Sequence, residues 1–331
     1  MTATHTFFRR PRLRPGVQIT RADAGFALTY RSQSADLDVP DFAAAEVAEL
    51  LEGLMAGAPS TQLRERAPNL SDFDGMLDEL DRLGLLTEDE RPAPATMTGE
   101  QLYRLVRRFT RRLQATSAGS ELFTRMTNGT ATRNQLIGYA LEYHHVVWQS
   151  PALIAPALAH AWHPDAYGIL QNFLRDEIGH DRMTRSALAA VGVPGPVLAS
   201  TQPLPATFAV CATLGAVAAQ DPLAFAACLS VVEEPSPQFN RAFAERARSL
   251  ELPAEFIQPL LDHSDVNADA GHADVSLALL STTSALGLEH AQAVLKQVAA
   301  LVESLSRLER DILLHYAGPE LALRIFEPDA E

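Results

Sequence analysis

Cysteine and lysine are both scarce in this sequence of 331 residues. Two cysteines, Cys211 and Cys228, are too few for a disulfide framework or for a metal site built from four thiolates. The single lysine is Lys296, so arginine supplies the other 26 of the 27 basic side chains. Both cysteines lie in apolar segments with helical patterning, so we expect buried free thiols in a reducing compartment.

Long apolar stretches and an excess of positive charge are also missing. The most apolar region, residues 206–232, is interrupted at Gln220-Asp221-Pro222. Neither half reaches the roughly 20 residues that a membrane-spanning helix needs. The first residues lack the apolar stretch of a signal peptide. A net charge of −14 disfavours binding to nucleic acid and to anionic membranes. We therefore expect a cytoplasmic protein that binds neither.

The composition is that of an ordinary globular protein, and it divides into two parts. Apolar residues make up 47% and charged residues 21%, which is enough to build a core. A short polar segment around Pro92 and Pro94 has the composition of a linker. We therefore expect two domains, residues 1–95 and residues 96–331.

The first domain combines strand-like and helical patterns. Val17–Thr20 and Phe26–Tyr30 flank a turn-like segment, and residues 35–39 alternate between apolar and acidic side chains. These patterns predict three short strands. Three helices are predicted next, the last of them over Ser71–Leu83 with its first residue as the cap. Three strands followed by three helices describe a small α+β winged-helix module.

Three segments of the first domain carry a family resemblance: RPGVQITRADAGFALTY, DLDVP and FDGMLDELDRLGLL. They resemble pyrroloquinoline-quinone synthesis protein D, whose relatives recognise the leaders of ribosomally made precursor peptides. The resemblance implies that a peptide adds as a strand at the edge Asp36–Pro40, against the helix Ser71–Leu83. The alternatives are dimerisation, which would make the chain a homodimer, and DNA binding. Residues 32–90 hold 3 arginines against 15 acidic residues, which disfavours DNA.

Helical patterning fills the rest of the chain, and prolines punctuate it. Helices are expected over 99–116, 120–127, 133–149, 152–161, 164–190, 206–219, 222–234, 238–249, 253–268 (or on to 286) and 288–316. No strand is predicted in this part. The second domain is therefore expected to be all-α, and the protein as a whole to be mainly α.

Carboxylates and histidines recur in the helical domain at spacings that suit a metal. Glu177 and His180 form an E-x-x-H motif, and Asp269 and His272 form a D-x-x-H motif. Residues three apart lie on one face of a helix, so each pair can offer one oxygen and one nitrogen to the same ion. Asp265 shares a face with the second pair, one turn earlier. Mixed carboxylate and imidazole ligands suit iron or manganese.

Two further segments bear on this site. Glu233 ends an otherwise apolar helix, where a carboxylate is costly unless it is paired or bound to a metal. Its neighbour Glu234 is the alternative ligand. Glu142 and His145 belong to a third E-x-x-H segment. In a ferritin-like four-helix bundle, Glu142 would join Glu233 and the two motifs as a metal ligand.

A second architecture competes with the ferritin-like bundle, and it rests on the segment LIGYALEYHHVVWQSPALIAPALAHAWHPDAYGILQNFLRDEIGHD. This segment resembles the early core helices of the heme-oxygenase-like superfamily. That superfamily includes pyrroloquinoline-quinone synthesis protein C, thiaminase II and the heme-oxygenase-like diiron oxidases. The resemblance covers about residues 100–315 and implies an all-α bundle that holds two iron ions and uses O2 as co-substrate. The ligands it implies are Glu177, His180, Glu233, Asp265, Asp269 and His272.

One position departs from the diiron pattern. Asp265 stands where that branch has a histidine, and His263 is about 200° away around a regular helix. Either Asp265 is a ligand or one of the two iron subsites is weak. In this architecture Glu142 and His145 are expected to line the pocket as catalytic residues and not to bind metal.

The resemblance implies a non-heme diiron oxidase or oxygenase that acts on an amino-acid-like substrate. Because a peptide-recognition module precedes the helical domain, we expect the substrate to be a residue of a ribosomally made precursor peptide. The alternatives are a metal-free oxidase like pyrroloquinoline-quinone synthesis protein C, and a non-catalytic protein that binds a peptide or partner. Thiaminase-like chemistry is disfavoured, since neither cysteine has a charged activating neighbour in the sequence.

Overall fold

The fold is taken from a computed structural model of the chain. It describes residues 8–22, 25–30, 33–39, 43–70, 72–89, 96–116 and 120–325, without the side chains of residues 33, 38, 115, 116, 268 and 269. The chain divides into two compact units, Met1–Thr96 and Met97–Glu331. This division is one residue away from the boundary drawn on the sequence. The prolines of the expected linker, Pro92 and Pro94, lie outside the described residues.

The first unit begins with short strands. They are β1 (Pro11–Leu13), β2 (Gln18–Ala22), β3 (Gly25–Tyr30) and β4 (Gln33–Asp38), with β5 (Leu86–Glu88) at the end of the unit. β2, β3 and β4 form an antiparallel sheet in that order, with Phe26 opposite Leu37, and they correspond to the three predicted strands. β1 pairs with β5. The sequence does not predict this second pair, because three residues carry too little alternation to be recognised.

Three helices complete this unit: α1 (Ala44–Ala56), α2 (Ser60–Arg66) and α3 (Phe73–Arg82). Their apolar faces meet the sheet in one core, in which Leu28 of β3 and Leu77 of α3 are fully buried. The cap of α3 is Asp72, whose side chain accepts a hydrogen bond of 3.0 Å from the main chain of Gly75. Ser71, which was the predicted cap, lies outside the described residues.

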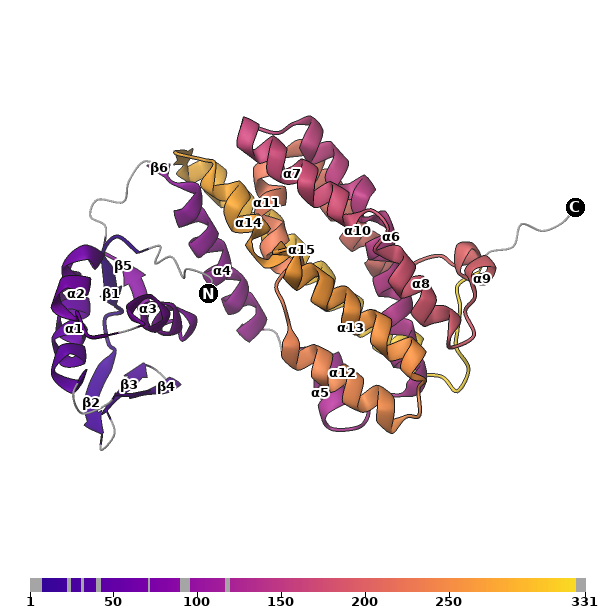
Figure 1. Cartoon of the computed structure of the whole chain (residues 1–331), viewed down its shortest axis with the longest axis horizontal. Helices are drawn as coiled ribbons and strands as arrows, with labels where there is room; N and C mark the ends of the chain where they lie inside the picture. The colour runs from indigo at the N-terminus through magenta and orange to yellow at the C-terminus, as the bar shows by residue number, and fades with distance from the viewer. Residues whose placement is uncertain are drawn as a thin grey trace, which may run out of the picture. The chain divides into compact units, whose positions relative to one another are not determined.

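The second unit is almost entirely helical (Figure 1). Its helices are α4 (Gly99–Thr116), α5 (Glu121–Thr127), α6 (Arg133–Ala159), α7 (Pro164–Glu177), α8 (Asp181–Ala189), α9 (Gly195–Ser200), α10 (Pro205–Gln220), α11 (Pro222–Val232), α12 (Pro237–Ser249), α13 (Ala254–Asp269), α14 (His272–Ser281) and α15 (Leu288–His315). Two strands of two residues each, β6 (Thr96–Met97) and β7 (Leu286–Gly287), are not predicted by the sequence. None of the described helices is long and apolar enough to span a membrane.

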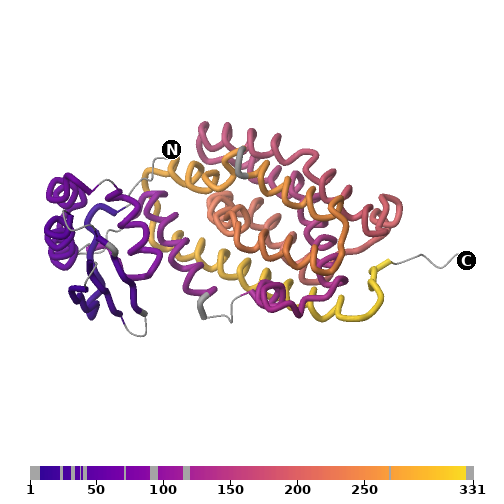
Figure 2. The backbone as a smooth tube through the Cα atoms, turned by 60° about the horizontal axis from the view of Figure 1, so that its bottom comes forward, coloured from indigo at the N-terminus to yellow at the C-terminus, as the bar shows by residue number. Residues whose placement is uncertain are grey.

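The middle of this bundle is formed by α11. All seven residues from Leu223 to Leu229 are buried, and a helix that is apolar all round is expected in a core. α11 packs against α10, α14 and α15, and α10 in turn packs against α6 and α15 (Figures 1 and 2). The helix leaves the core at its carboxyl end, where Val232 and Glu233 are partly buried and Glu234 is exposed.

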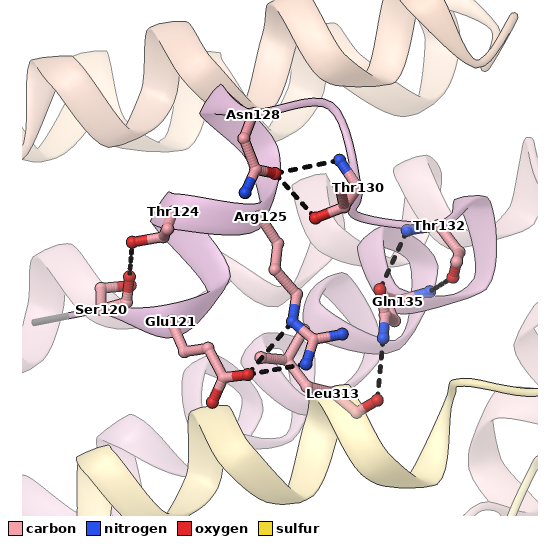
Figure 3. Close-up of polar contacts among 9 residues, drawn as sticks. All are labelled: Ser120, Glu121, Thr124, Arg125, Asn128, Thr130, Thr132, Gln135 and Leu313. Carbon is pink, nitrogen blue, oxygen red and sulfur yellow. Dashed lines mark hydrogen bonds and ion pairs between the residues drawn. The ribbon is translucent and has the colours of Figure 1, made fainter. Parts of the chain in front are cut away.

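The start of α6 is fixed to α15 by polar contacts. Thr132 and Gln135 form a reciprocal capping box at the first turn of α6. Gln135 also donates a hydrogen bond of 2.8 Å from Nε2 to the carbonyl of Leu313 in α15 (Figure 3). This buried contact sets the position of α6, the helix that carries Glu142, Tyr143 and Ser150.

α6 is one helix, although two prolines interrupt its sequence. The prediction of separate helices over 133–149 and 152–161 is wrong, since α6 runs on through Pro151 and Pro156. Pro151 has no N–H to donate to the carbonyl of Val147, four residues earlier. The hydroxyl of Ser150 donates to that carbonyl at 3.0 Å, so the acceptor freed by the proline is satisfied.

Two breaks occur where the sequence predicts continuous helix. The expected helix 164–190 is divided into α7 and α8, and Gly179 between them has a φ of +96°. α13 and α14 are divided in the same way at Gly271, which has a φ of +73°. A positive φ is accessible to glycine at little cost, and it ends a right-handed helix.

Candidate metal centre

Three side chains of metal-ligand type meet at the ends of three helices. Glu177 is the last residue of α7, Glu233 follows α11 as its C-cap, and His272 is the first residue of α14. Nδ1 of His272 is 3.3 Å from Oε1 of Glu177 and 3.3 Å from Oε2 of Glu233. One ligand atom from each residue lies within 4.8 Å of the other two, so these atoms can reach one ion.

The two histidine motifs lie at breaks between helices. From the sequence, each motif was predicted to lie on one face of a continuous helix. Glu177 ends α7, and His180 precedes α8 as its cap. Asp269 ends α13 and His272 begins α14. In both motifs a glycine with positive φ directly precedes the histidine. The chain therefore turns at the glycine and points the imidazole back toward the acidic residues.

Two more imidazoles lie beside these three residues. Nδ1 of His180 is 3.5 Å from Oε1 of Glu177. The ring centre of His180 is 5.0 Å from that of His263 in α13 and 6.1 Å from that of His272. Nδ1 of His263 is hydrogen-bonded to the hydroxyl of Tyr143 at 2.9 Å. We call Glu177, His180, Glu233, His263 and His272 together the Glu–His cluster.

Several buried polar atoms of the Glu–His cluster have no hydrogen-bond partner within the described part of the chain. They are Oε1 of Glu177, Nδ1 of His180, Nε2 of His263 and both ring nitrogens of His272. Each unpaired buried polar atom costs about 1–3 kcal/mol, so native structures rarely leave several together. A bound cation would satisfy these lone pairs. Because the donors are carboxylate oxygens and imidazole nitrogens, the residues fit iron.

The charges within the cluster are coupled. Burial works against ionisation of Glu177, but the contacts with His180 and with Ser150 outweigh it and lower the pKa of this carboxyl. The hydroxyl oxygen of Ser150 lies 2.8 Å from Oε2 of Glu177, so its one proton can go to this carboxyl or to the carbonyl of Val147. Burial raises the pKa of Glu233, and the negative charge of Glu177 adds to that effect. Burial alone would lower the pKa of His272, but its contact with Glu233 raises it.

This coupling has a consequence for cation binding. The raised pKa values of Glu233 and His272 mean that each of these groups holds a proton more readily than it does in water. A cation bound by these residues would take the place of such protons, since ligands must be deprotonated. Burial and the neighbouring His180 lower the pKa of His263 to about 4, so its ring is neutral and ready to act as a ligand.

The remaining predicted ligands have different positions. Asp265 is exposed to solvent. Like His180 and His263, it is not in the group whose ligand atoms all lie within 4.8 Å of one another, which consists of Glu177, Glu233 and His272. The side chain of Asp269 is not among those that the structure describes, so its function as a ligand stays a prediction. Glu234 points to the surface, where its Oε1 lies 3.4 Å from Nη2 of Arg107. Of the two adjacent glutamates, Glu233 is therefore the one that contacts His272.

Glu142 and His145, the predicted catalytic residues, lie on another face of α6 from Tyr143. Glu142 is fully buried and accepts hydrogen bonds from the hydroxyl of Tyr316 at 2.7 Å, from the main chain of Leu204 at 2.9 Å and from the hydroxyl of Thr207. These partners lie in and beside α10 and at the end of α15. Three donors occupy most of the acceptor sites of this buried carboxyl group, which favours a structural function.

His145 is likewise directed away from the Glu–His cluster. Its Nε2 is 3.3 Å from the hydroxyl of Thr201, and burial lowers the pKa of its imidazole. A catalytic role for His145 stays a prediction. The two cysteines are buried, and burial raises the pKa of Cys211 to about 11 and of Cys228 to about 12. Both thiols are therefore poor nucleophiles at neutral pH.

Sequence reasoning missed three residues at the cluster. His263 was set aside because of its angle around a regular helix, and neither Tyr143 nor Ser150 was considered as a neighbour of the ligands. Tyr143 and Ser150 are seven residues apart on α6, so they share a face two turns apart. That spacing is the sequence signal that could have identified them.

Comparison with known proteins identifies the family. The sequence profile of a family described as iron-containing redox enzyme matches residues 137–306, which is just over half of the chain. The chain belongs to this family of iron-containing redox enzymes. All five residues of the Glu–His cluster lie within the matched range. A comparison with curated proteins finds no match.

Two solved structures resemble this iron-containing redox enzyme. A domain of unknown function with a heme oxygenase-like fold from Shewanella denitrificans is 19% identical, with a TM-score of 0.55, over 67% of this chain and 94% of that chain. A TenA homolog from Pseudomonas syringae is 16% identical, with a TM-score of 0.52, over 68% of this chain and 98% of that chain. At such identities the likeness shows the fold alone. The predicted heme-oxygenase-like fold is confirmed, and the ferritin-like alternative is set aside.

Proposed function

We propose that this chain is a non-heme, O2-dependent oxidoreductase that holds two iron ions in the Glu–His cluster. The observation that carries the proposal is the set of buried carboxylate and imidazole atoms that find no hydrogen-bond partner among the residues the structure describes. Membership of an iron-containing redox family supports it. Iron, when bound, would supply the redox chemistry with O2.

The protein's own residues would hold and shield this chemistry. Glu177 and Glu233 would offer carboxylate oxygens, and His180, His263 and His272 would offer imidazole nitrogens as ligands. Oε1 of Glu177 contacts both His180 and His272, at 3.5 Å and 3.3 Å, so it lies between two groups of ligands. The ring of Phe173 packs edge-on against His272 at 4.9 Å. The low exposure of the cluster keeps bulk water away from reactive species.

We propose further that the substrate is a residue of a ribosomally made precursor peptide and that the first unit binds its leader. β4 lies at an edge of the sheet β2-β3-β4. An edge strand offers main-chain groups to an incoming strand. Leu37 and Val39 near this edge, and Met76 and Leu83 at α3, are partly buried apolar side chains that could supply pockets. Pro40, at the end of the predicted docking edge, lies outside the described residues.

Iron content and O2 uptake test the first part of this proposal. The purified chain is loaded anaerobically with Fe(II), and bound iron and O2 consumption are measured for the wild type and for the variants His272→Ala and Asp269→Ala. Both variants should lose iron and O2 uptake. His290→Ala, which changes an exposed histidine paired with Asp221, is the matched control and should keep both. Unchanged iron content and O2 uptake in His272→Ala and Asp269→Ala would refute the function.

Hydrogen–deuterium exchange tests the peptide site. Peptides are selected from a displayed random library on the full chain, and the exchange of main-chain amides is compared with and without a selected peptide. An added strand should protect the amides of β4. β2 is the internal control, because it is the other edge strand of the same sheet. Protection confined to β2 or to the second unit would contradict leader binding at β4.

A further inference from the structure

His263 has the environment of a metal ligand, although the sequence pattern puts Asp265 in that place. His263 is 2% exposed, whereas the side chain of Asp265 is exposed to solvent. The two residues lie on the same helix, α13, two positions apart. Since about 200° separates such neighbours around the helix axis, only one of them can face the Glu–His cluster.

The break between α13 and α14 changes which residues of α13 can lie beside His272. Asp265, Asp269 and His272 share a face only if one helix continues through all three positions. The chain leaves the helix at Asp269 and turns at Gly271, where φ is +73°. The direction of His272 is therefore set by the turn and not by the periodicity of α13. A residue on another face of α13 can then lie beside His272.

The hydrogen bonds of His263 leave one nitrogen for an ion. Nδ1 is held by the hydroxyl of Tyr143 at 2.9 Å, whereas Nε2 is buried and has no partner in the described part of the chain. An imidazole that binds metal through one nitrogen usually has the other fixed by a hydrogen bond, which orients the ring. Tyr143 is thus a positioning residue. The ring of His263 also lies 5.0 Å from that of His180, whose Nδ1 has no hydrogen bond within the described part of the chain and lies 3.5 Å from Oε1 of Glu177.

We propose that His263, and not Asp265, is the nitrogen ligand that α13 contributes, and that it forms a second iron subsite together with His180 and Glu177. This inference rests on the proposed function, because it requires the Glu–His cluster to hold two ions. Glu177 is the shared residue, since its Oε1 contacts both His180 and His272. Glu233 and His272 belong to the other subsite.

Anaerobic titration with Fe(II) tests this assignment, with bound iron counted per chain. His263→Asn is the informative variant, because its amide can keep the hydrogen bond to Tyr143 while the Nε2 donor is lost. Asp265→Asn is the matched control on the same helix. We expect two iron ions per chain in the wild type and in Asp265→Asn, and one in His263→Asn. Two ions in His263→Asn, or one in Asp265→Asn, overturns the assignment.

A second variant keeps the inference testable if His263→Asn does not fold. Tyr143→Phe removes only the hydroxyl that orients His263, and the loss of such a partner weakens metal binding by about 10- to 100-fold. The affinity for the second iron should fall by this factor while the first is unchanged. Equal affinities in Tyr143→Phe and wild type overturn the inference. A wild type that binds fewer than two iron ions refutes the diiron function itself, and the wild-type count therefore distinguishes the two failures.

Discussion

Removing one hydrogen-bond donor from the buried carboxyl group of Glu142 tests whether this residue is structural or catalytic. It is 0% exposed and accepts three hydrogen bonds, one of them from the hydroxyl of Tyr316 at 2.7 Å. These contacts join the middle of α6 to the start of α10 and to the end of α15. Tyr316→Phe removes one donor and keeps the ring, which packs closely against Gly138. The packing is thus preserved while one hydrogen bond is lost.

The size of the effect follows from the kind of bond that is lost. A hydrogen bond to a charged group contributes about 1.5–3 kcal/mol to stability. In a domain of this length, 1 kcal/mol shifts the melting temperature by about 2–4 °C. Tyr316→Phe should therefore lower the melting temperature of the chain by about 3–12 °C. Glu142 keeps two of its donors, so the variant should still fold.

The assay combines thermal unfolding with iron analysis. Tyr167→Phe is the matched control, because the same hydroxyl is removed from a side chain that is 48% exposed. A surface change of this kind should alter stability by at most about 0.5 kcal/mol. Neither variant should change the iron content. An unchanged melting temperature in Tyr316→Phe would refute the structural interpretation of Glu142, and a loss of iron would return this residue to the active site.

Three other predictions concern acid stability, the helix breaks and the choice of glutamate. Burial lowers the pKa of His144 from 6.5 to about 4, so its imidazole binds a proton more readily in the unfolded chain than in the folded one. Stability should fall as the pH drops from about 6.5 to 4, and less so in His144→Asn, as measured by thermal unfolding across this range. In urea unfolding, Gly179→Ala should lose about 1–3 kcal/mol because φ is +96°, whereas Gly168→Ala, inside α7 with free space around it, should gain up to about 1 kcal/mol. Iron analysis should show a loss in Glu233→Gln and none in Glu234→Gln.

Much of the helical architecture can be predicted from the sequence because it depends on local periodicity. The expected segments 99–116 and 222–234 correspond closely to α4 and α11. Proline is a weaker guide than the prediction assumed. α6 continues through Pro151 because a nearby hydroxyl satisfies the freed carbonyl, which is a contact that no propensity encodes. The positions of helix ends therefore depend on individual side chains.

The candidate site is less predictable, because its residues depend on the direction of the chain at two turns. Glu177, Glu233 and His272 are found from residue type and spacing alone, and the structure brings them together. Asp265 was predicted by extending one helix beyond Gly271, where the backbone turns. His263 was set aside for the same reason. The dipeptide Gly-His in both motifs is the signal that the helix ends there.

The proline in α6 also has a consequence for Glu177. The carbonyl of Val147 that Pro151 leaves without an amide partner takes the proton of Ser150 at 3.0 Å, and the same hydroxyl lies 2.8 Å from Oε2 of Glu177. A hydroxyl has one proton, so the helix and the carboxylate compete for it. The proline ring at position 151 of α6 thus affects how firmly the side chain of Glu177, at the end of α7, is held by Ser150. A main-chain N–H at position 151, as in Pro151→Ala, would offer the carbonyl of Val147 a second donor and so leave the Ser150 proton freer for Glu177.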